Sequence, residues 1–107
     1  MGTTAGGVRM KVSTSGARIL RVLKSLKGYS LTGLSNGELA TALHESPANI
    51  NRALTTLIDE GLAQKLENGR FAMSMAMLQI AHAHATEVTR AQDRLNEMNQ
   101  RLLAGSR

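Results

Sequence analysis

The chain has 107 residues, which is enough for one domain with a modest core, and 42% of them are hydrophobic. The absence of cysteine excludes disulfides and thiolate metal sites and agrees with a reducing compartment. No apolar run reaches the length of a membrane span, so we expect a soluble protein.

The net charge of +5 is spread unevenly along the chain. Residues 1–27 contain no acid, and their basic residues are Arg9, Lys11, Arg18, Arg21, Lys24 and Lys27. A basic N-terminal third suggests a polyanion as partner, and a merely soluble basic face is the alternative.

Residues 1–14 are rich in Gly and Thr and are predicted to form a flexible N-terminal arm. From about Ser15 to Lys27 an apolar stripe at helical spacing predicts the first helix, which Gly28 closes. The stripe consists of Ile19, Leu20, Leu23 and Leu26. Leu31 and Leu34, in the connection that follows, are expected to be buried.

A second helix is predicted to begin at Ser35, because Ser35 and Glu38 match the capping box. It ends at His44 and Glu45, and a third helix follows almost at once. Two short helices joined so tightly form a helix-turn-helix, in which the second helix of the motif enters the major groove of DNA.

The third helix has signals at both ends. Ser46 suits the N-cap, Pro47 the first helical position, and Gly61 the left-handed residue past the end. Ile50, Leu54, Leu57 and Ile58 recur at helical spacing, which predicts one buried face. The opposite face carries Ala48, Asn49, Asn51, Arg52, Thr55 and Thr56. Such groups read base edges or hold phosphates, whereas an ordinary half-buried helix is the alternative interpretation.

A β-hairpin is predicted next. Asn68-Gly69 is a strong hairpin signal, since both residues tolerate the positive φ of a type I′ turn. The candidates for its inner face are Leu62, Leu66, Phe71 and Met73. A hairpin directly after a helix-turn-helix is a wing, which makes Lys65 and Arg70 candidates for phosphate contact, with solvated charges as the alternative.

The ordered set of segments Ala17–Leu23, Glu38–Ala40, Asn51–Leu62 and Asn68–Met73 resembles the N-terminal DNA-binding domain of the IclR family of bacterial transcription regulators. The resemblance implies a winged helix-turn-helix that binds duplex DNA. Two departures matter. Ala48-Asn49 stands where the family usually has Ser-Thr, so a different DNA sequence is expected. The family's large C-terminal effector-binding domain is missing, so small-molecule sensing does not carry over.

In its place, a helix is predicted from about Ser74 to Leu103, with a length of about 45 Å. A heptad seam, in alternating steps of four and three, consists of Met77, Ala81, His84, Val88, Ala91, Leu95, Met98 and Leu102. Such a seam is typical of a coiled coil. The alternative is that the early part packs on the winged helix while the rest frays.

We expect neither catalysis nor a cofactor. His82 and His84 point to different faces of a helix, and no further His, Cys or nearby acid completes a metal site. No nucleophile, base and orienting group converge, so the chain is predicted not to be an enzyme.

The sequence therefore predicts a mainly α fold with a small β-hairpin, in which a winged helix-turn-helix (residues 15–75) precedes a C-terminal helix (residues 76–107). The expected function is sequence-specific binding of duplex DNA as a cytoplasmic transcription regulator, of bacterial or phage origin, without a small-molecule effector or a membrane. The predicted DNA contacts are Ser15, Arg18, Ser46, Ala48, Asn49, Asn51, Arg52, Thr55, Thr56, Lys65, Asn68 and Arg70. The seam residues from Ala81 to Leu102 are assigned to a homodimer that recognises an inverted repeat. The alternative is a protein docking module that pairs with another protein through the C-terminal helix.

Overall fold

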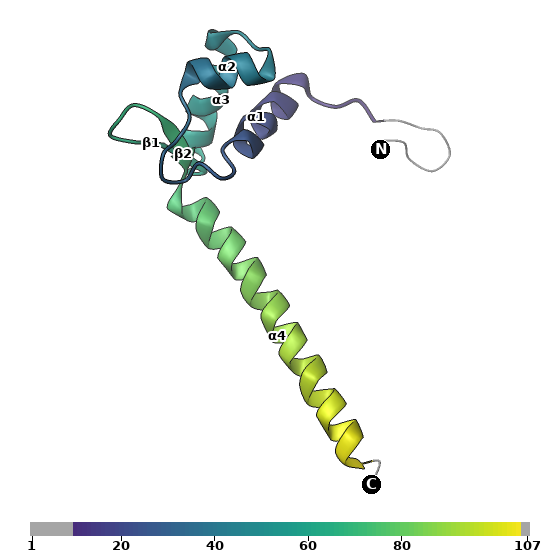
Figure 1. Ribbon diagram of the computed structural model, residues 1–107. Helices are drawn as coiled ribbons and strands as arrows, with labels where there is room; N and C mark the ends of the chain where they lie inside the picture. The colour runs from purple at the N-terminus through teal and green to yellow at the C-terminus, as the bar shows by residue number, and fades with distance from the viewer. Residues whose placement is uncertain (1–9, 106–107) are drawn as a thin grey trace. The chain divides into compact units, whose positions relative to one another are not determined.

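The computed structural model describes residues 10–105, and its chain divides into two units with the boundary between Ser74 and Met75 (Figure 1). The first unit contains α1 (Thr14–Ser25), α2 (Asn36–Leu43), α3 (Pro47–Asp59), β1 (Ala63–Lys65) and β2 (Phe71–Met73). The second unit is α4 (Met75–Gly105). The predicted fold, a winged helix-turn-helix followed by a long helix, is confirmed. Residues 1–9 of the predicted arm lie outside the described residues.

The helix ends follow the local signals in the sequence. Ser35 and Glu38 form the complete capping box, with Ser35 N donating to Glu38 Oε1 at 2.9 Å and Glu38 N donating to Ser35 Oγ at 3.1 Å. Ser46 Oγ accepts a hydrogen bond from Asn49 N at 3.1 Å, and Gly61 has a φ of +77°. These contacts use backbone groups that a helix end leaves unpaired.

The core of the first unit surrounds α3. Helices α1 and α2 and strand β1 all pack against it. The largest fully buried side chains are Val22, Leu26, Leu39, Ile50 and Leu54. Leu62, Phe71 and Met73 pack against this core as the sequence predicted, whereas Leu66 is half-buried outside the cluster.

Three apolar residues expected in the core are exposed. Leu20 is 59% exposed, because the stripe of α1 that meets the core runs through Val22 and Leu26 instead. Leu31, at 93%, lies in the connection after α1, and Ile58, at 39%, lies at the edge of the buried face of α3. Helical spacing predicts which side of a helix is buried. Which residues of that side lie at the centre of the contact depends on how the two helices cross.

The wing turn differs from the predicted type I′ turn. Gly69 has a φ of +83°, but Asn68 is not left-handed, since His44 is the one non-glycine residue with positive φ in residues 10–105. Gly69 N donates to Leu66 O at 2.9 Å, and Leu66 N donates to Arg70 O at 2.7 Å. The loop is therefore a type I turn followed by a left-handed glycine. The Asn68 side chain donates a hydrogen bond from Nδ2 to Thr32 O and accepts one at Oδ1 from Arg70 N. These two hydrogen bonds stabilise this form of the turn.

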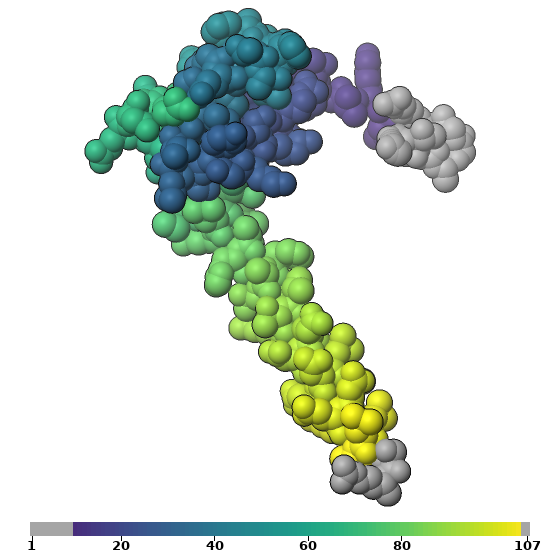
Figure 2. All heavy atoms as spheres, viewed as in Figure 1, coloured from purple at the N-terminus to yellow at the C-terminus, as the bar shows by residue number. Residues whose placement is uncertain are grey.

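The second unit, α4, is a single helix of 31 residues and is about 46 Å long. None of its side chains is buried. Figure 2 shows one face of this helix with its heavy atoms drawn as spheres. Within residues 10–105, no helix is both long enough and apolar enough to cross a bilayer.

Gly33 joins the α1–α2 connection to the wing. Its neighbour Leu34 exchanges two backbone hydrogen bonds with Phe71, each 2.8 Å long. Gly33 is buried with a φ of +73°, and a Cβ atom there would lie 2.9 Å from Arg70 Cβ and 3.0 Å from Phe71 O. This approach of two backbone segments requires a residue without a side chain.

Gly33→Ala should therefore destabilise the domain by about 3 kcal/mol or more, combining left-handed backbone strain with overlap against the wing. Gly28→Ala is the matched control, because Gly28 has a φ of +85° and a Cβ atom added there would meet no other residue within 4 Å. It should cost only about 1–2 kcal/mol. Urea unfolding of both variants measures the difference, and equal losses would contradict the proposed close approach.

Candidate nucleic-acid interface

The exposed face of α3 carries most of the predicted DNA contacts. Its exposed members are Ala48, Asn51, Arg52, Thr55 and Thr56. Thr55 Oγ1 donates to Asn51 O at 2.8 Å, and Thr56 Oγ1 donates to Arg52 O at 2.9 Å. Each hydroxyl proton is thus used inside the helix, so each threonine offers acceptor lone pairs and a methyl group to a partner. Those groups suit base amino groups and the thymine methyl group better than phosphates.

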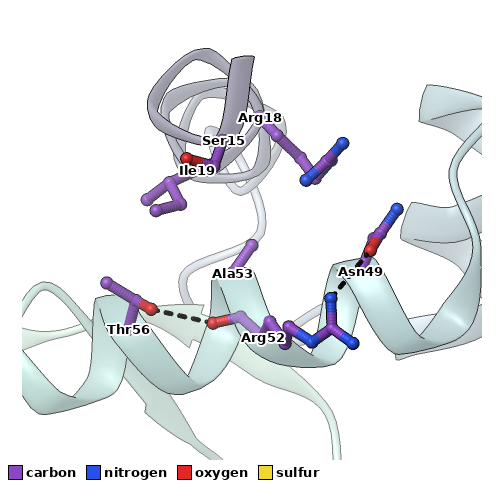
Figure 3. Close-up of a pocket in the computed structure, with 7 residues that line it drawn as sticks. All are labelled: Ser15, Arg18, Ile19, Asn49, Arg52, Ala53 and Thr56. Carbon is purple, nitrogen blue, oxygen red and sulfur yellow. Dashed lines mark hydrogen bonds between the residues drawn. The ribbon is translucent and has the colours of Figure 1, made fainter. Parts of the chain in front are cut away.

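An open pocket of about 290 Å³ lies between α1 and α3 (Figure 3). It is lined by Ser15, Arg18, Ile19, Asn49, Arg52, Ala53 and Thr56. The side chains of Arg18 and Arg52, from different helices, both extend toward Asn49 (Figure 3). The structure therefore brings five of the predicted contact residues, from two separate segments, to one site.

Glu45, which was predicted only to end the second helix, completes this cluster. Its Oε1 lies 3.1 Å from Arg18 Nε and accepts a hydrogen bond from Asn49 Nδ2 at 3.2 Å. The Arg18 guanidinium, followed by the Asn49 amide, lowers the pKa of Glu45 below its usual value, against an opposing effect of desolvation. No local pattern predicts this contact, because Arg18 and Glu45 meet only once α1 packs beside the helix-turn-helix.

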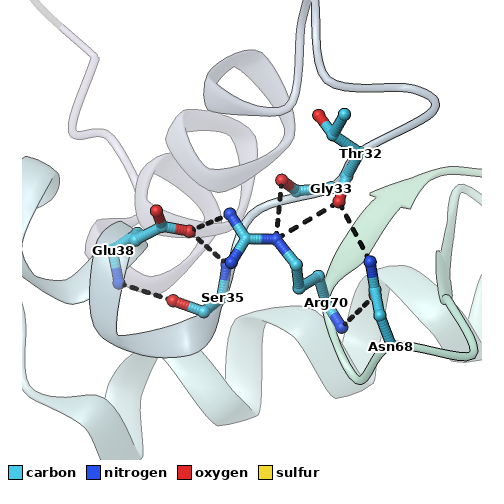
Figure 4. Close-up of polar contacts among 6 residues, drawn as sticks. All are labelled: Thr32, Gly33, Ser35, Glu38, Asn68 and Arg70. Atoms are coloured by element: carbon cyan, nitrogen blue, oxygen red, sulfur yellow. Dashed lines mark hydrogen bonds and ion pairs between the residues drawn. The ribbon is translucent and has the colours of Figure 1, made fainter.

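A second polar cluster, the wing clasp, contains Thr32, Gly33, Glu38, Asn68 and Arg70 (Figure 4). Arg70 Nη2 donates to Glu38 Oε1 at 2.5 Å, and Arg70 Nε lies 3.2 Å from both Thr32 O and Gly33 O. Asn68 Nδ2 donates to Thr32 O at 3.4 Å. Asn68 and Arg70, both predicted to contact DNA, thus use their polar groups to fasten the wing to the α1–α2 connection and to Glu38 of α2.

The remaining wing candidate, Lys65, is exposed. Its ammonium lies 5.8 Å from the centre of the Phe71 ring, a cation–π distance. No acid pairs with it among residues 10–105. Its charge is therefore available to a partner.

The residues assigned to dimerisation all lie on α4. Their larger side chains stand open to solvent, with Val88 at 50%, Leu95 at 58%, Met98 at 54% and Leu102 at 69% exposure. Ala81 and His84 are also exposed, and Ala91 is half-buried. Seven-residue spacing puts Val88, Leu95 and Leu102 on one side of the helix.

The carboxylates of Glu38 and Glu45 should make the free energy of unfolding depend on pH. Hydrogen bonding to the Ser35 backbone, with Arg70 contributing, lowers the pKa of Glu38, and the pKa of Glu45 is lowered as described. A lowered folded-state pKa stabilises the fold above the unfolded-state value, and this stabilisation is lost as pH falls through the folded-state value.

The free energy of unfolding should therefore fall between neutral pH and about pH 3, as urea titrations at a series of pH values can measure. The double variant Glu38→Gln/Glu45→Gln should be less stable than the parent at neutral pH, and this difference should disappear at low pH. Glu60→Gln is the control, since the Glu60 side chain makes no hydrogen bond or ion pair within residues 10–105. A difference that persists at low pH would contradict the assignment.

Comparison with known proteins identifies the type of the helix-turn-helix domain. A family model described as the IclR helix-turn-helix domain matches residues 15–67. The structure of an IclR family transcriptional regulator from Brucella abortus is similar with a TM-score of 0.60 and 22% sequence identity, over 78% of this chain and 32% of that one. This chain thus spans about a third of the length of the Brucella regulator.

S. aureus MepR bound to ethidium bromide is similar with a TM-score of 0.50 and 14% identity, over 90% of this chain and 74% of that one. No curated protein matches the sequence. The matched segment contains all of α1 but its first residue, together with α2, α3 and β1, in the order that the sequence resemblance implied. The chain therefore carries an IclR-type helix-turn-helix domain over residues 15–67, and the structure shows this domain in a winged helix-turn-helix fold.

Proposed function

We propose that this protein binds duplex DNA in a sequence-specific manner and acts as a transcription regulator, with α3 entering the major groove. The observation that carries the proposal is the exposed face of α3. It holds a guanidinium, amides and acceptor hydroxyls, has no acid between Pro47 and Ile58, and borders the pocket that contains Arg18. This combination fits the polar edges of bases and the adjoining phosphates.

Within this proposal the predicted residues have different roles. Those directed at bases are Asn49, Asn51, Arg52, Thr55 and Thr56. Ser15 and Arg18 contact the phosphate backbone from α1, and Lys65 does so from the wing. Ser46 caps α3, and the small side chain of Ala48 lets the helix approach the groove. For Asn68 and Arg70 the wing clasp supports a structural role, which keeps the wing in place for Lys65.

We further propose that the protein acts as a homodimer through the heptad seam of α4. One recognition helix and one wing cover a few base pairs, which is little information for a genome-scale target. A two-fold symmetric dimer doubles the contact set and recognises an inverted repeat, with half-sites about one or two helical turns apart. The exposure of Val88, Leu95 and Leu102 along one side of α4 supports a helical partner there.

The same exposed seam also fits a second function, in which the winged helix docks onto another protein and α4 pairs with that partner. DNA binding and docking differ in their dependence on salt. Displacement of counterions from DNA makes affinity fall steeply as salt rises, whereas an apolar helix pair responds weakly.

Binding to random duplex DNA over a salt series tests the DNA-binding function, with a steep loss of affinity expected. In the same assay Arg52→Ala should cost about 1–3 kcal/mol while leaving the fold intact. Arg90→Ala, which removes an equal charge from exposed α4, is the control and should cost less. No binding by the parent protein at low salt would contradict the DNA-binding function and favour docking.

Leu95→Glu should separate the dimer by placing a charge in the seam. An unpaired buried charge costs about 3–5 kcal/mol, so the dissociation constant should rise by about 100-fold or more. Gln100→Glu adds the same charge at an exposed position off the seam and should leave the dimer intact. Sedimentation reports the mass, and footprinting should show one half-site in place of two. A parent protein that is monomeric at micromolar concentration would contradict the homodimer.

A further inference from the structure

Glu45 is an acid placed beside the proposed DNA-contacting groups. Its side chain is 19% exposed and lies against Arg18 of α1 and Asn49 of α3. A carboxylate this close to a DNA backbone repels phosphates, so by charge alone it weakens binding. Its contacts with neighbouring side chains indicate what Glu45 contributes to DNA recognition.

The contacts continue from Glu45 through Asn49 to Arg52. Arg52 Nη1 donates to Asn49 Oδ1 at 3.4 Å, while Asn49 Nδ2 donates to Glu45 Oε1 at 3.2 Å. The Asn49 amide therefore has an anion at its nitrogen end and a cation at its oxygen end. Turning the amide over would set its oxygen against the carboxylate and its NH₂ group against the guanidinium, which are two repulsive contacts. The two charged neighbours thus select one orientation of the amide.

This orientation leaves part of the amide free. An asparagine amide has two N–H donors and two acceptor lone pairs, and the network uses one of each. The remaining donor and acceptor are the pair that the major-groove edge of adenine requires, because adenine presents an acceptor at N7 and a donor at its N6 amino group. Asn49 is half-buried, which further restricts its motion.

Arg18 contacts the same carboxylate oxygen of Glu45 as Asn49 does. Its Nε lies 3.1 Å from the same Oε1 atom, and its side chain is only 22% exposed. Glu45 is therefore already paired with a residue of α1 in the DNA-free protein. An amide fixed in advance loses less rotational freedom on binding, which favours the base that matches its orientation over one that does not.

We propose that Glu45 is a positioning residue for base recognition, which, anchored by Arg18, holds the Asn49 amide in the orientation that pairs with adenine. This inference rests on the proposed binding of DNA through α3. Glu45 then raises discrimination between sequences while lowering affinity for DNA in general. Its removal should change these two quantities in opposite directions. A residue needed only for folding would lower both, and a residue acting only by charge would change affinity for all sequences alike.

The test compares Glu45→Ala, Glu45→Gln and Asn49→Ala with the parent protein. Bound sequences are selected from a random duplex pool, and affinities are then measured for the selected duplex and for duplexes with one base pair changed. The parent should prefer an A·T pair at one position of each half-site, and Asn49→Ala should lose this preference. Glu45→Ala should reduce discrimination at that position by about tenfold and bind unrelated duplexes more tightly. Glu45→Gln keeps an acceptor oxygen and should retain most of the discrimination.

Glu60→Ala is the matched control, since it removes an exposed carboxylate just past the end of α3 and should leave the preference at every position unchanged. A direct view of the network comes from the side-chain amide protons of Asn49 in the DNA-free protein. Their exchange with water, followed by nuclear magnetic resonance, should be slow in the parent and in Glu45→Gln and faster in Glu45→Ala.

Two results would overturn the inference while leaving the proposed function standing. The first is unchanged discrimination by Glu45→Ala at the position that Asn49→Ala affects. The second is a uniform loss of preference at all positions, accompanied by unchanged exchange of the Asn49 amide. Failure of the parent protein to bind any duplex would overturn the proposed function itself, and this inference with it.

Discussion

The structure of the first unit depends on the burial of one face of α3. Ile50, Ala53, Leu54 and Leu57 are each at most 2% exposed, and α1, α2 and β1 all pack on them. Burying each large side chain contributes about 1.5–3 kcal/mol, so another rotation of α3 about its axis would be costly. Because successive side chains project about 100° apart around a helix, this burial also fixes the outward direction of Arg52 and the other polar residues. The core therefore sets the geometry of the candidate interface.

Polar contacts then hold the edges of that interface. Glu38 combines two tasks, since it completes the capping box of α2 and accepts the Arg70 guanidinium. A partly exposed ion pair of this kind adds little to stability in isolation. Its effect here is geometric, because it ties the wing to the start of the helix-turn-helix beside the close approach of Gly33. Glu45 does the same on the other side, where it links α1 to α3. In each cluster a carboxylate pairs with an arginine of the same domain, Glu38 with Arg70 and Glu45 with Arg18. The side chains of Lys65 and Arg52 are exposed, so their positive charges face solvent.

Local signals in the sequence predict the helices and strands and which of their faces are polar. The caps at Ser35 and Ser46 and the end of α3 near Gly61 were predicted, because such signals act on backbone groups a few residues away. The apolar and polar faces of α3 were predicted for a similar reason, since helical periodicity is a local property. Most of the residues proposed to contact DNA from α3 follow from that pattern.

Contacts between residues far apart in the sequence follow from how the elements pack. Arg70 and Glu38 are 32 residues apart, and Arg18 and Glu45 lie on separate helices, so neither pairing has a local signature. The exposure of Leu20 was decided in the same way, by how α1 crosses its neighbours. A sequence pattern specifies which polar or apolar group each residue presents for contact within its own turn or strand. Which partner receives it depends on the packing of elements, and that packing minimises the free energy of the whole core and not of any one segment.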